Sequence, residues 1–151
     1  MMTVLMDDYL SQWKERIEFV EARVLRKGKT DEPLDVAFVE GAITADEQAE
    51  KLKKLRARTK KLIAIGSCAC TGAPSALRNE FDLKRQEEIE FILDRFKYVE
   101  KVRKIEDIVS IDGKVVGCPM NTKLFLETLN SLFIESGLTT VDILEKHQKE
   151  F

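Results

Sequence analysis

The sequence predicts an α/β fold built on a mainly parallel sheet in a single domain. Two observations support the fold and a third supports the single domain. Short apolar and β-branched runs alternate with longer stretches of helical periodicity, as they do in parallel α/β proteins. One of these runs is apolar throughout, which is typical of a strand buried on both faces of a sheet. No repeat, low-complexity tract or linker interrupts the 151 residues, so we expect a single domain over residues 1–151.

The first segments of the chain predict one helix and two strands. Apolar residues at helical spacing indicate an amphipathic helix over residues 4–17. Residues 17–25, IEFVEARVL, alternate and carry β-branched side chains, which favours a strand. Residues 35–41, DVAFVEG, form a second short strand after a polar, turn-forming stretch.

A charged helix follows the second strand. Thr44 and Glu47 have the spacing of a capping box, which predicts where the helix begins. We expect the helix over residues 45–61, ADEQAEKLKKLRARTKK, and its basic end is a solvated face because no aromatic residues interleave with it. Its buried stripe is expected at Ala49, Leu52 and Leu55, extended by Ala45 and Thr59.

The middle of the chain predicts a buried strand, a helix and a less regular segment. KLIAIG, residues 61–66, is the fully apolar run, and a glycine ends it. Residues 108–117 contain Asp112-Gly113, a hairpin-type turn signal, and fit either one kinked strand or a small hairpin. Residues 81–96 have helical spacing, with apolar positions at Leu83, Ile89, Ile92, Leu93 and Phe96.

Two helices are expected to close the chain, over residues 122–137 and 139–151, with Gly137 as the C-cap between them. The apolar stripe of the helix over 122–137 is most simply explained as part of the core, and part of it could also form a partner interface. Trp13 is expected in the core as well. The stripe consists of Phe125, Leu129, Leu132 and Phe133.

Composition excludes several classes of function. Lys plus Arg is 25 and Asp plus Glu is 27, so a net charge of −2 gives no electrostatic case for nucleic acid or an anionic membrane. The apolar runs are far too short for a membrane span, and MMTVLMDDYL lacks the features of a secretory signal. We therefore expect a cytoplasmic protein. Its three cysteines cannot all pair, and disulfides are unfavoured in that compartment.

Three of the predicted strands end in distinctive loops, VEGAIT, GSCACTG and VGCPMN. Because the carboxyl ends of parallel strands meet at one edge of a sheet, these loops are expected to converge. Cys68 and Cys118 both follow a glycine there, so their thiolates could bind one soft metal or cluster while backbone amides approach its sulfurs. The alternative is that both are small buried hydrophobic residues.

A cysteine nucleophile is a second hypothesis for this edge. It needs a nearby base, and the one histidine of the sequence, His147, falls in the pattern of the last helix. Glu40 could replace it, but a carboxylate beside a thiol raises the thiol's pKa and opposes activation. This hypothesis is therefore weaker than the metal-binding one.

Taken in order, DVAFVEGAIT, LIAIGSCACTGAPSALRN and VVGCP resemble the small subunit of [NiFe] hydrogenases, most closely the cytosolic, cofactor-coupled groups. The superfamily includes the cluster-carrying small subunit of respiratory complex I. The resemblance covers the chain from about residue 5 to the helix after Cys118, and it implies a flavodoxin-like, three-layer α/β domain.

The resemblance also implies a cofactor and a role. Family members hold a proximal [4Fe–4S] cluster that exchanges electrons with the nickel–iron site of a large subunit, so the chain would not be catalytic alone. Cys68 matches the third cluster ligand and Cys118 the fourth, whereas Cys70 matches none and is expected to pack beneath the loop. The other residues expected beside the cluster are Glu40, Gly41, Gly66, Ser67, Gly117 and Pro119.

The sequence departs from the family at its beginning. It contains no CxxC motif, so only two of the four cysteine ligands are present, and the family's first strand is missing. Either that segment lies upstream of Met1, or the chain has lost the strand. In the second case it binds no cluster and is an interaction or assembly module, or it completes a cluster with another chain. A missing strand would expose the edges of its two neighbours and favour a homodimer. The expected partners are otherwise the large nickel–iron subunit and further electron-transfer subunits.

Overall fold

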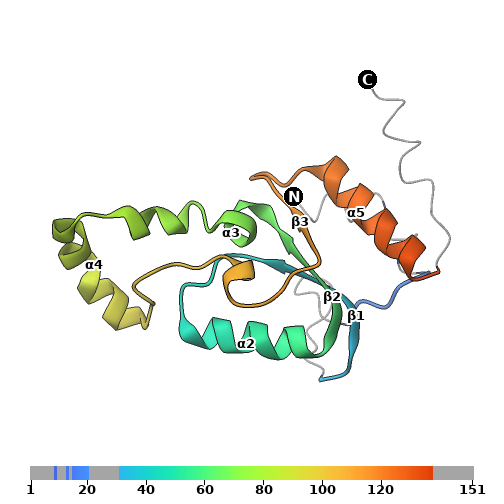
Figure 1. Ribbon diagram of the computed structural model, residues 1–151, viewed down its shortest axis with the longest axis horizontal. Helices are drawn as coiled ribbons and strands as arrows, with labels where there is room; N and C mark the ends of the chain where they lie inside the picture. The colour runs from blue at the N-terminus through green and yellow to red at the C-terminus, as the bar shows by residue number, and fades with distance from the viewer. Residues whose placement is uncertain (1–8, 10–12, 14, 21–30, 138–151) are drawn as a thin grey trace. The chain divides into compact units, whose positions relative to one another are not determined.

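The computed structural model describes Tyr9, Trp13, residues 15–20 and residues 31–137. The chain divides into two units. One comprises residues 33–120 and contains the sheet (Figure 1). The other combines residues 1–32 with residues 121–151. The expectation of a single domain over the whole chain stays a prediction.

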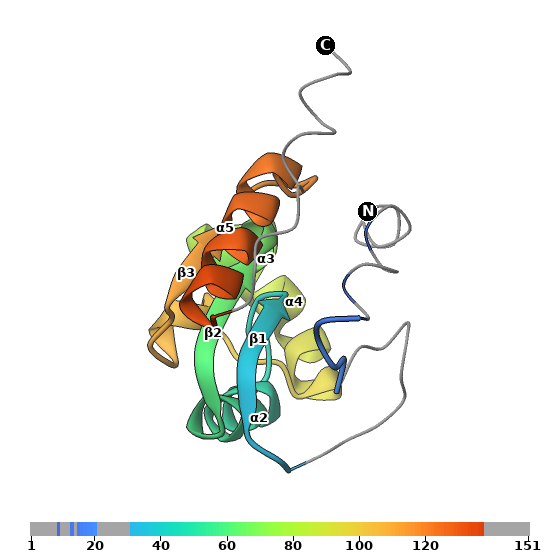
Figure 2. The ribbon, with the colours of Figure 1, turned by 90° about the vertical axis from the view of Figure 1, so that its right-hand side faces the viewer.

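The sheet of the larger unit has three strands in the order β1-β2-β3, and both pairings are parallel (Figures 1 and 2). At the carboxyl ends, Glu40 lies opposite Ile65, and Ile65 lies opposite Val115. All three strands therefore end at the same level. This confirms the predicted α/β class with a parallel sheet. The strands are β1 (Leu34–Glu40), β2 (Thr59–Ile65) and β3 (Gly113–Val115).

Two expectations about strands are corrected. Residues 17–20 are not a strand, and the rest of the predicted strand over 17–25 lies outside the described residues. In a flavodoxin-like sheet the first strand separates the second from the third. Here the strands predicted at 35–41 and 61–66 pair directly with each other instead of presenting two open edges. The direct pairing removes that particular reason for a homodimer.

The helix after β1 begins one residue later than the capping-box pattern predicts. Helix α2 spans Asp46–Ala57. Gln48 supplies the capping side chain, since its Oε1 accepts hydrogen bonds from the backbone N–H groups of Thr44 (2.8 Å) and Ala45 (3.3 Å). Glu47, the predicted partner, instead forms an ion pair with the lysine one turn further along.

The same helix ends earlier than predicted, because the basic stretch at 53–61 is shared between α2 and β2. The chain changes from helix to strand at Thr59. Its hydroxyl donates a 2.7 Å hydrogen bond to the carbonyl of Leu55, while its backbone already belongs to the strand. Within α2, Ala49 and Leu52 are buried as predicted.

The core of the larger unit gathers residues from β2, both neighbouring helices and the 3-10 helix η2 (Ile105–Asp107). Leu62 and Ala64 face this cluster and are fully buried, and the alternate residues Ile63 and Ile65 are buried as well. Strand β2 is therefore buried on both faces, as its continuous apolar run predicts. The buried members of the cluster are Ile43, Ala49, Leu52, Leu62, Ala64, Ala69, Cys70 and Ile105.

Asp112-Gly113 begins β3 and does not form a hairpin. Asp112 is hydrogen-bonded twice to Leu62: its carboxylate accepts from the Leu62 N–H and its own N–H donates to the Leu62 carbonyl, both at 2.8 Å. Arg56 lies 3.4 Å from the same carboxylate. A Cβ at Gly113 would stand 3.0 Å from the Ile63 side chain, so a glycine suits this close approach. These contacts align β3 beside β2.

Helix α4 (Leu83–Phe96) is present as predicted, and most of its apolar side chains are exposed. The Asp82 carboxylate caps its first turn by accepting a 2.9 Å bond from the Arg85 N–H. Leu83 is 78% exposed and Phe96 57% exposed, because α4 lies beyond the end of the sheet and packs on neither face (Figure 1).

The described part of the second unit is centred on helix α5 (Thr122–Glu135). The predicted stripe is buried, and the Trp13 ring makes an edge contact with Phe125 at 6.4 Å between ring centres. Gly137 has φ 73°, which matches its predicted role after the helix. The predicted helix over 139–151 lies outside the described residues. None of the described helices is long and apolar enough to cross a bilayer.

The buried strand β2 gives a first test of the core. We expect Leu62→Ala to lower the free energy of unfolding by about 2–5 kcal/mol, because a completely buried leucine leaves a cavity. Leu83→Ala is the matched control, with an expected change within about 0.5 kcal/mol, since that side chain is exposed. Urea denaturation followed by circular dichroism measures both. Equal losses would contradict the assigned core.

A cluster of three charges beside β3 gives a second test. The ammonium groups of Lys104 and Lys114 bond to the carboxylate of Glu106 and lower its pKa from 4.5 to about 2. A depressed carboxyl pKa stabilises the fold above the unfolded value and loses that contribution as the pH falls from about 4.5 toward 2. Glu106→Gln should therefore reduce the difference in unfolding free energy between about pH 6 and about pH 3.

Glu88→Gln on the exposed side of α4 makes the same change of charge and serves as the control, because no cation of the described residues lies within ion-pair distance of Glu88. Urea titrations at the two pH values measure the difference. If both variants keep the wild-type pH dependence, the three-charge cluster does not contribute to stability.

Candidate functional site

Three glycines mark the carboxyl edge of the sheet. Gly41 follows β1, Gly66 follows β2, and Gly117 comes two residues after β3. Their φ angles are 95°, 82° and 120°, in the left-handed region that favours glycine. Each strand thus turns sharply as it leaves the sheet. The predicted convergence of the three loops at one edge is confirmed.

The cysteine segment after β2 is a short helix and not the predicted loop. Helix α3 spans Gly66–Thr71, and Gly72 ends it in a left-handed conformation, with its N–H donating to the Cys68 carbonyl at 2.9 Å (Figure 1). The Thr71 hydroxyl donates to the Ser67 carbonyl at 2.8 Å. The helical turn fixes Cys68 near its start, where the side chain is half-buried.

A backbone hydrogen bond joins the two cysteine-bearing segments. The Ser67 N–H donates to the Gly117 carbonyl at 3.1 Å, so the residues directly before Cys68 and Cys118 are in contact. Cys118 is exposed, and it precedes Pro119 through a cis peptide bond. The structure therefore places these two predicted ligands at the same edge of the sheet.

Cys70 points away from this edge into the core. It is 5% exposed, and its Sγ lies 3.4 Å from the Ala64 carbonyl and 3.8 Å from the Val115 carbonyl. Burial raises the pKa of the Cys70 thiol. A buried, protonated thiol bonded to two carbonyls suits packing better than metal binding or nucleophilic attack.

Glu40 ends β1 and is exposed. Its carboxylate makes no hydrogen bond or ion pair within the described part of the chain. His147, the other candidate base for a cysteine nucleophile, lies outside the described residues. Among the described residues, no hydrogen bond or ion pair holds the Glu40 carboxylate beside a thiol at this edge.

The described residues do not form a complete metal site. No group of three or more His, Cys, Asp or Glu side chains among them is placed to bind a metal ion. The edge brings together the segments that carry two thiols, whereas a four-cysteine cluster requires two more ligands. All three cysteines of the printed sequence are accounted for by Cys68, Cys70 and Cys118. A [4Fe–4S] cluster therefore does not fit on this set of residues alone.

The SALRN motif has a structural role that sequence reasoning missed. It forms the 3-10 helix η1 (Ser75–Glu80). Asn79 makes two 2.8 Å bonds with the backbone N–H and carbonyl of Val102, and Arg78 donates to the carbonyl of Val99. These bonds hold residues 98–102 opposite α4. The polar Arg-Asn pair directly before a helix was the signal that could have indicated this connection.

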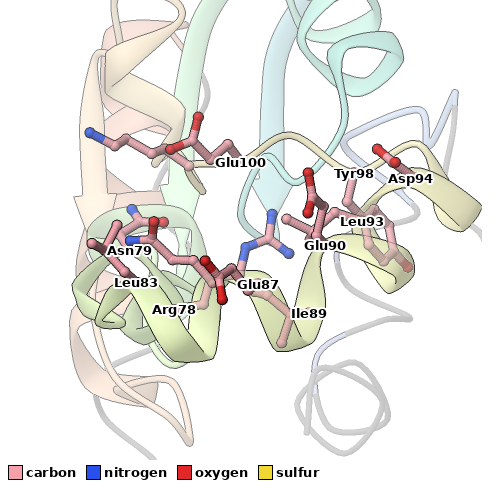
Figure 3. Close-up of a pocket in the computed structure, with 12 residues that line it drawn as sticks. Arg78, Asn79, Leu83, Glu87, Ile89, Glu90, Leu93, Asp94, Tyr98 and Glu100 are labelled. Carbon is pink, nitrogen blue, oxygen red and sulfur yellow. The ribbon is translucent and has the colours of Figure 1, made fainter.

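A pocket of about 380 Å³ lies between η1, α4 and the segment that follows it (Figure 3). Both apolar and charged side chains line it. This pocket involves none of the residues predicted for the cluster. Its lining residues are Arg78, Asn79, Leu83, Gln86, Glu87, Ile89, Glu90, Leu93, Asp94, Tyr98, Glu100 and Lys101.

Several known proteins with similar sequences belong to hydrogenases. NAD-reducing hydrogenase HoxS subunit delta of Cupriavidus necator is 25% identical over 143 residues, which cover 84% of this chain and 68% of that protein. A component of the F420-non-reducing hydrogenase of Methanothermobacter thermautotrophicus is 29% identical over 134 residues, which cover 78% of this chain and 44% of that protein. The chain thus spans less than half the length of the second relative.

A similar fold occurs in a solved structure. A chain from a crystal structure of an NAD+-reducing [NiFe]-hydrogenase in the H2-reduced state superposes with a TM-score of 0.70 at 24% identity. The match covers 90% of this chain and 83% of that one. At this identity the likeness establishes a shared fold.

The family itself is established by a match over most of the sequence. The model described as NADH ubiquinone oxidoreductase, 20 Kd subunit, matches residues 2–132. The order of loops, the parallel sheet and the hydrogenase relatives agree with it. The chain belongs to the family of the NADH ubiquinone oxidoreductase 20 kDa subunit, as its resemblance to hydrogenase small subunits predicts.

Proposed function

We propose that the chain is an electron-transfer subunit of a [NiFe]-hydrogenase-type oxidoreductase, in which Cys68 and Cys118 are two of the ligands of a proximal [4Fe–4S] cluster. One observation carries the proposal most directly. The hydrogen bond between Ser67 and Gly117 fastens together the two segments that present these cysteines at the edge where ligands gather in parallel sheets.

The surroundings of the two thiols support this assignment. Gly66 and Gly117 expose backbone at the strand ends, which suits close approach to cluster sulfurs. A Cβ at Gly66 would stand 3.8 Å from the Gly117 carbonyl, so the two segments already run close together. Ser67, Gly41, Glu40 and Pro119 are the remaining residues of the proposed cluster environment.

The missing ligands define what the proposal requires. Two thiolates cannot hold the cluster by themselves, so the proposal requires two further ligands beside Cys68 and Cys118. In this assembly the partners are a large nickel–iron subunit and further electron-transfer subunits. The three unpaired cysteines suit a reducing compartment, and we propose a cytoplasmic location.

The alternative is a cluster-free interaction or assembly module of the same fold. The observation that favours it is the incomplete ligand set among the described residues. Both functions predict a stable complex with hydrogenase-type subunits, but only the electron-transfer role predicts iron that depends on Cys68 and Cys118.

Metal analysis of the intact complex separates the two functions. The tagged chain is purified without oxygen together with its bound partners, and iron, sulfide and the EPR spectrum are measured per complex. Cys68→Ala and Cys118→Ala are each expected to remove about four irons, the content of one cluster, together with its EPR signal. Cys70→Ala is the matched control and should keep both, since this thiol faces the core.

Co-elution of the partners shows whether each variant still assembles. Iron and sulfide unchanged in all three variants, with assembly intact, would exclude the ligand assignment and leave the cluster-free module. Loss of iron in the Cys70→Ala complex as large as in the other two would also contradict it, because the effect would then be a general loss of structure.

A further inference from the structure

The pocket beside α4 has walls that are fixed by hydrogen bonds from η1. Asn79 bonds to both backbone groups of Val102, and Arg78 bonds to the carbonyl of Val99. The same segment is tied to the end of the β1–α2 connection, because the Val99 N–H donates to the Thr44 carbonyl at 2.8 Å. The pocket is therefore a formed feature of the fold and not a gap beside a loose helix.

The rim of this pocket carries carboxylates without cationic partners. Glu87, Glu90 and Asp94 project from α4, and Glu100 comes from the opposite segment (Figure 3). No Lys, Arg or His of the described chain lies within 4 Å of any of these four carboxylates. Seven other carboxylates of the same unit form ion pairs, although some, such as Glu40 and Glu88, do not. The paired ones are Asp35, Asp46, Glu47, Glu50, Glu106, Asp107 and Asp112.

Two cations line the pocket and leave this excess of negative charge in place. Arg78 is committed to the wall, since it donates to the Val99 carbonyl and lies over the Tyr98 ring at 5.8 Å. Its Nε is buried without a hydrogen-bond partner in the described structure. Lys101 is the second cation. Four carboxylates against two cations make the pocket acidic.

Apolar side chains surround the acidic pocket. Leu83 is 78% exposed, and Tyr98 is 41% exposed with the Phe96 ring stacked on it at 5.8 Å. Ile89 and Leu93 form a half-buried floor. Six of the eight exposed large hydrophobic side chains of the described residues fall between residues 77 and 98. Such a concentration is typical of an interaction surface.

We propose that this acidic, apolar pocket is a docking site for a basic amphipathic segment of another protein subunit. Lysine or arginine side chains of that segment would meet the unpaired carboxylates, while its apolar side chains would cover Leu83, Phe96 and Tyr98. A small cation could pair with the carboxylates but could not cover the apolar side chains. The docking site shares no residue with the proposed cluster environment, so either proposal can fail without the other.

A labelled peptide tests the site on the full chain. The probe is a fluorescein-labelled helical peptide of leucine and lysine, about 14 residues long so that it can form a helix. Its counterpart has glutamate in place of every lysine. Fluorescence anisotropy is expected to show saturable binding of the basic peptide only, and spermidine should displace it weakly.

Paired variants show where the peptide binds. Glu90→Gln combined with Asp94→Asn should raise the Kd about tenfold, as should Leu83→Ser. The matched control is Glu47→Gln combined with Glu50→Gln, which removes the same charge from the exposed side of α2 and should leave the Kd within about twofold. The variants lie on exposed positions, and circular dichroism confirms that each is folded.

Three results would overturn the proposal. If the double variants on α4 and α2 raise the Kd of the basic peptide equally, the peptide is attracted only by the overall negative charge of the protein. Equal binding of the glutamate peptide would mean that the apolar surface binds peptides without regard to their charge. Displacement by spermidine at concentrations similar to those of the basic peptide would mean a site for small cations instead of a protein segment.

Discussion

The parallel pairing of β2 with one strand on each side is the interaction on which the rest of the larger unit depends. It brings the ends of β1, β2 and β3 to one level, with Ile65 between Glu40 and Val115. Each parallel connection requires a crossover, and α2 supplies the first. Asp112 completes the alignment, because its two bonds to Leu62 set where β3 begins beside the central strand.

The chemistry of the carboxyl edge follows from this alignment. Positive φ angles turn the chain out of the sheet at Gly66 and Gly117, and the two segments meet through the Ser67 N–H. The helical turn of α3 then separates its two cysteines. Cys68 stays near the edge, whereas Cys70 enters the core toward the Ala64 carbonyl. One short segment thus presents one thiol to a ligand and uses the other for packing.

The surface around α4 and its pocket exists because the sheet does not cover the apolar side of this helix. Helix α4 has a clear amphipathic pattern, yet its apolar residues remain at the surface because the helix lies beyond the sheet (Figure 1). The bonds from Arg78 and Asn79 hold the next segment across from it. Exposed apolar side chains concentrated beside a formed pocket are typical of an interaction surface, and the unpaired carboxylates there favour the basic partner segment proposed above.

Local sequence pattern is enough to predict the α/β class, the apolar strand over 61–66, the meeting of three loops at one edge and the family. Each depends on local pattern: continuous apolar residues, glycines at strand ends, and motifs in a fixed order. The capping partner, the end of α2 and the start of β3 depended on specific hydrogen bonds from Gln48, Thr59 and Asp112, which spacing does not reveal.

Which amphipathic helices pack into the core depends on long-range packing and cannot be read from their sequences. Helices α2 and α4 both show apolar residues at helical spacing, but α2 faces β2 and buries Leu52, whereas α4 reaches no sheet face and exposes Leu83. Periodicity reports that a helix has an apolar side, and it carries no information about what lies opposite that side. Contacts between residues distant in sequence make that choice, and they leave the apolar side of α4 at the surface.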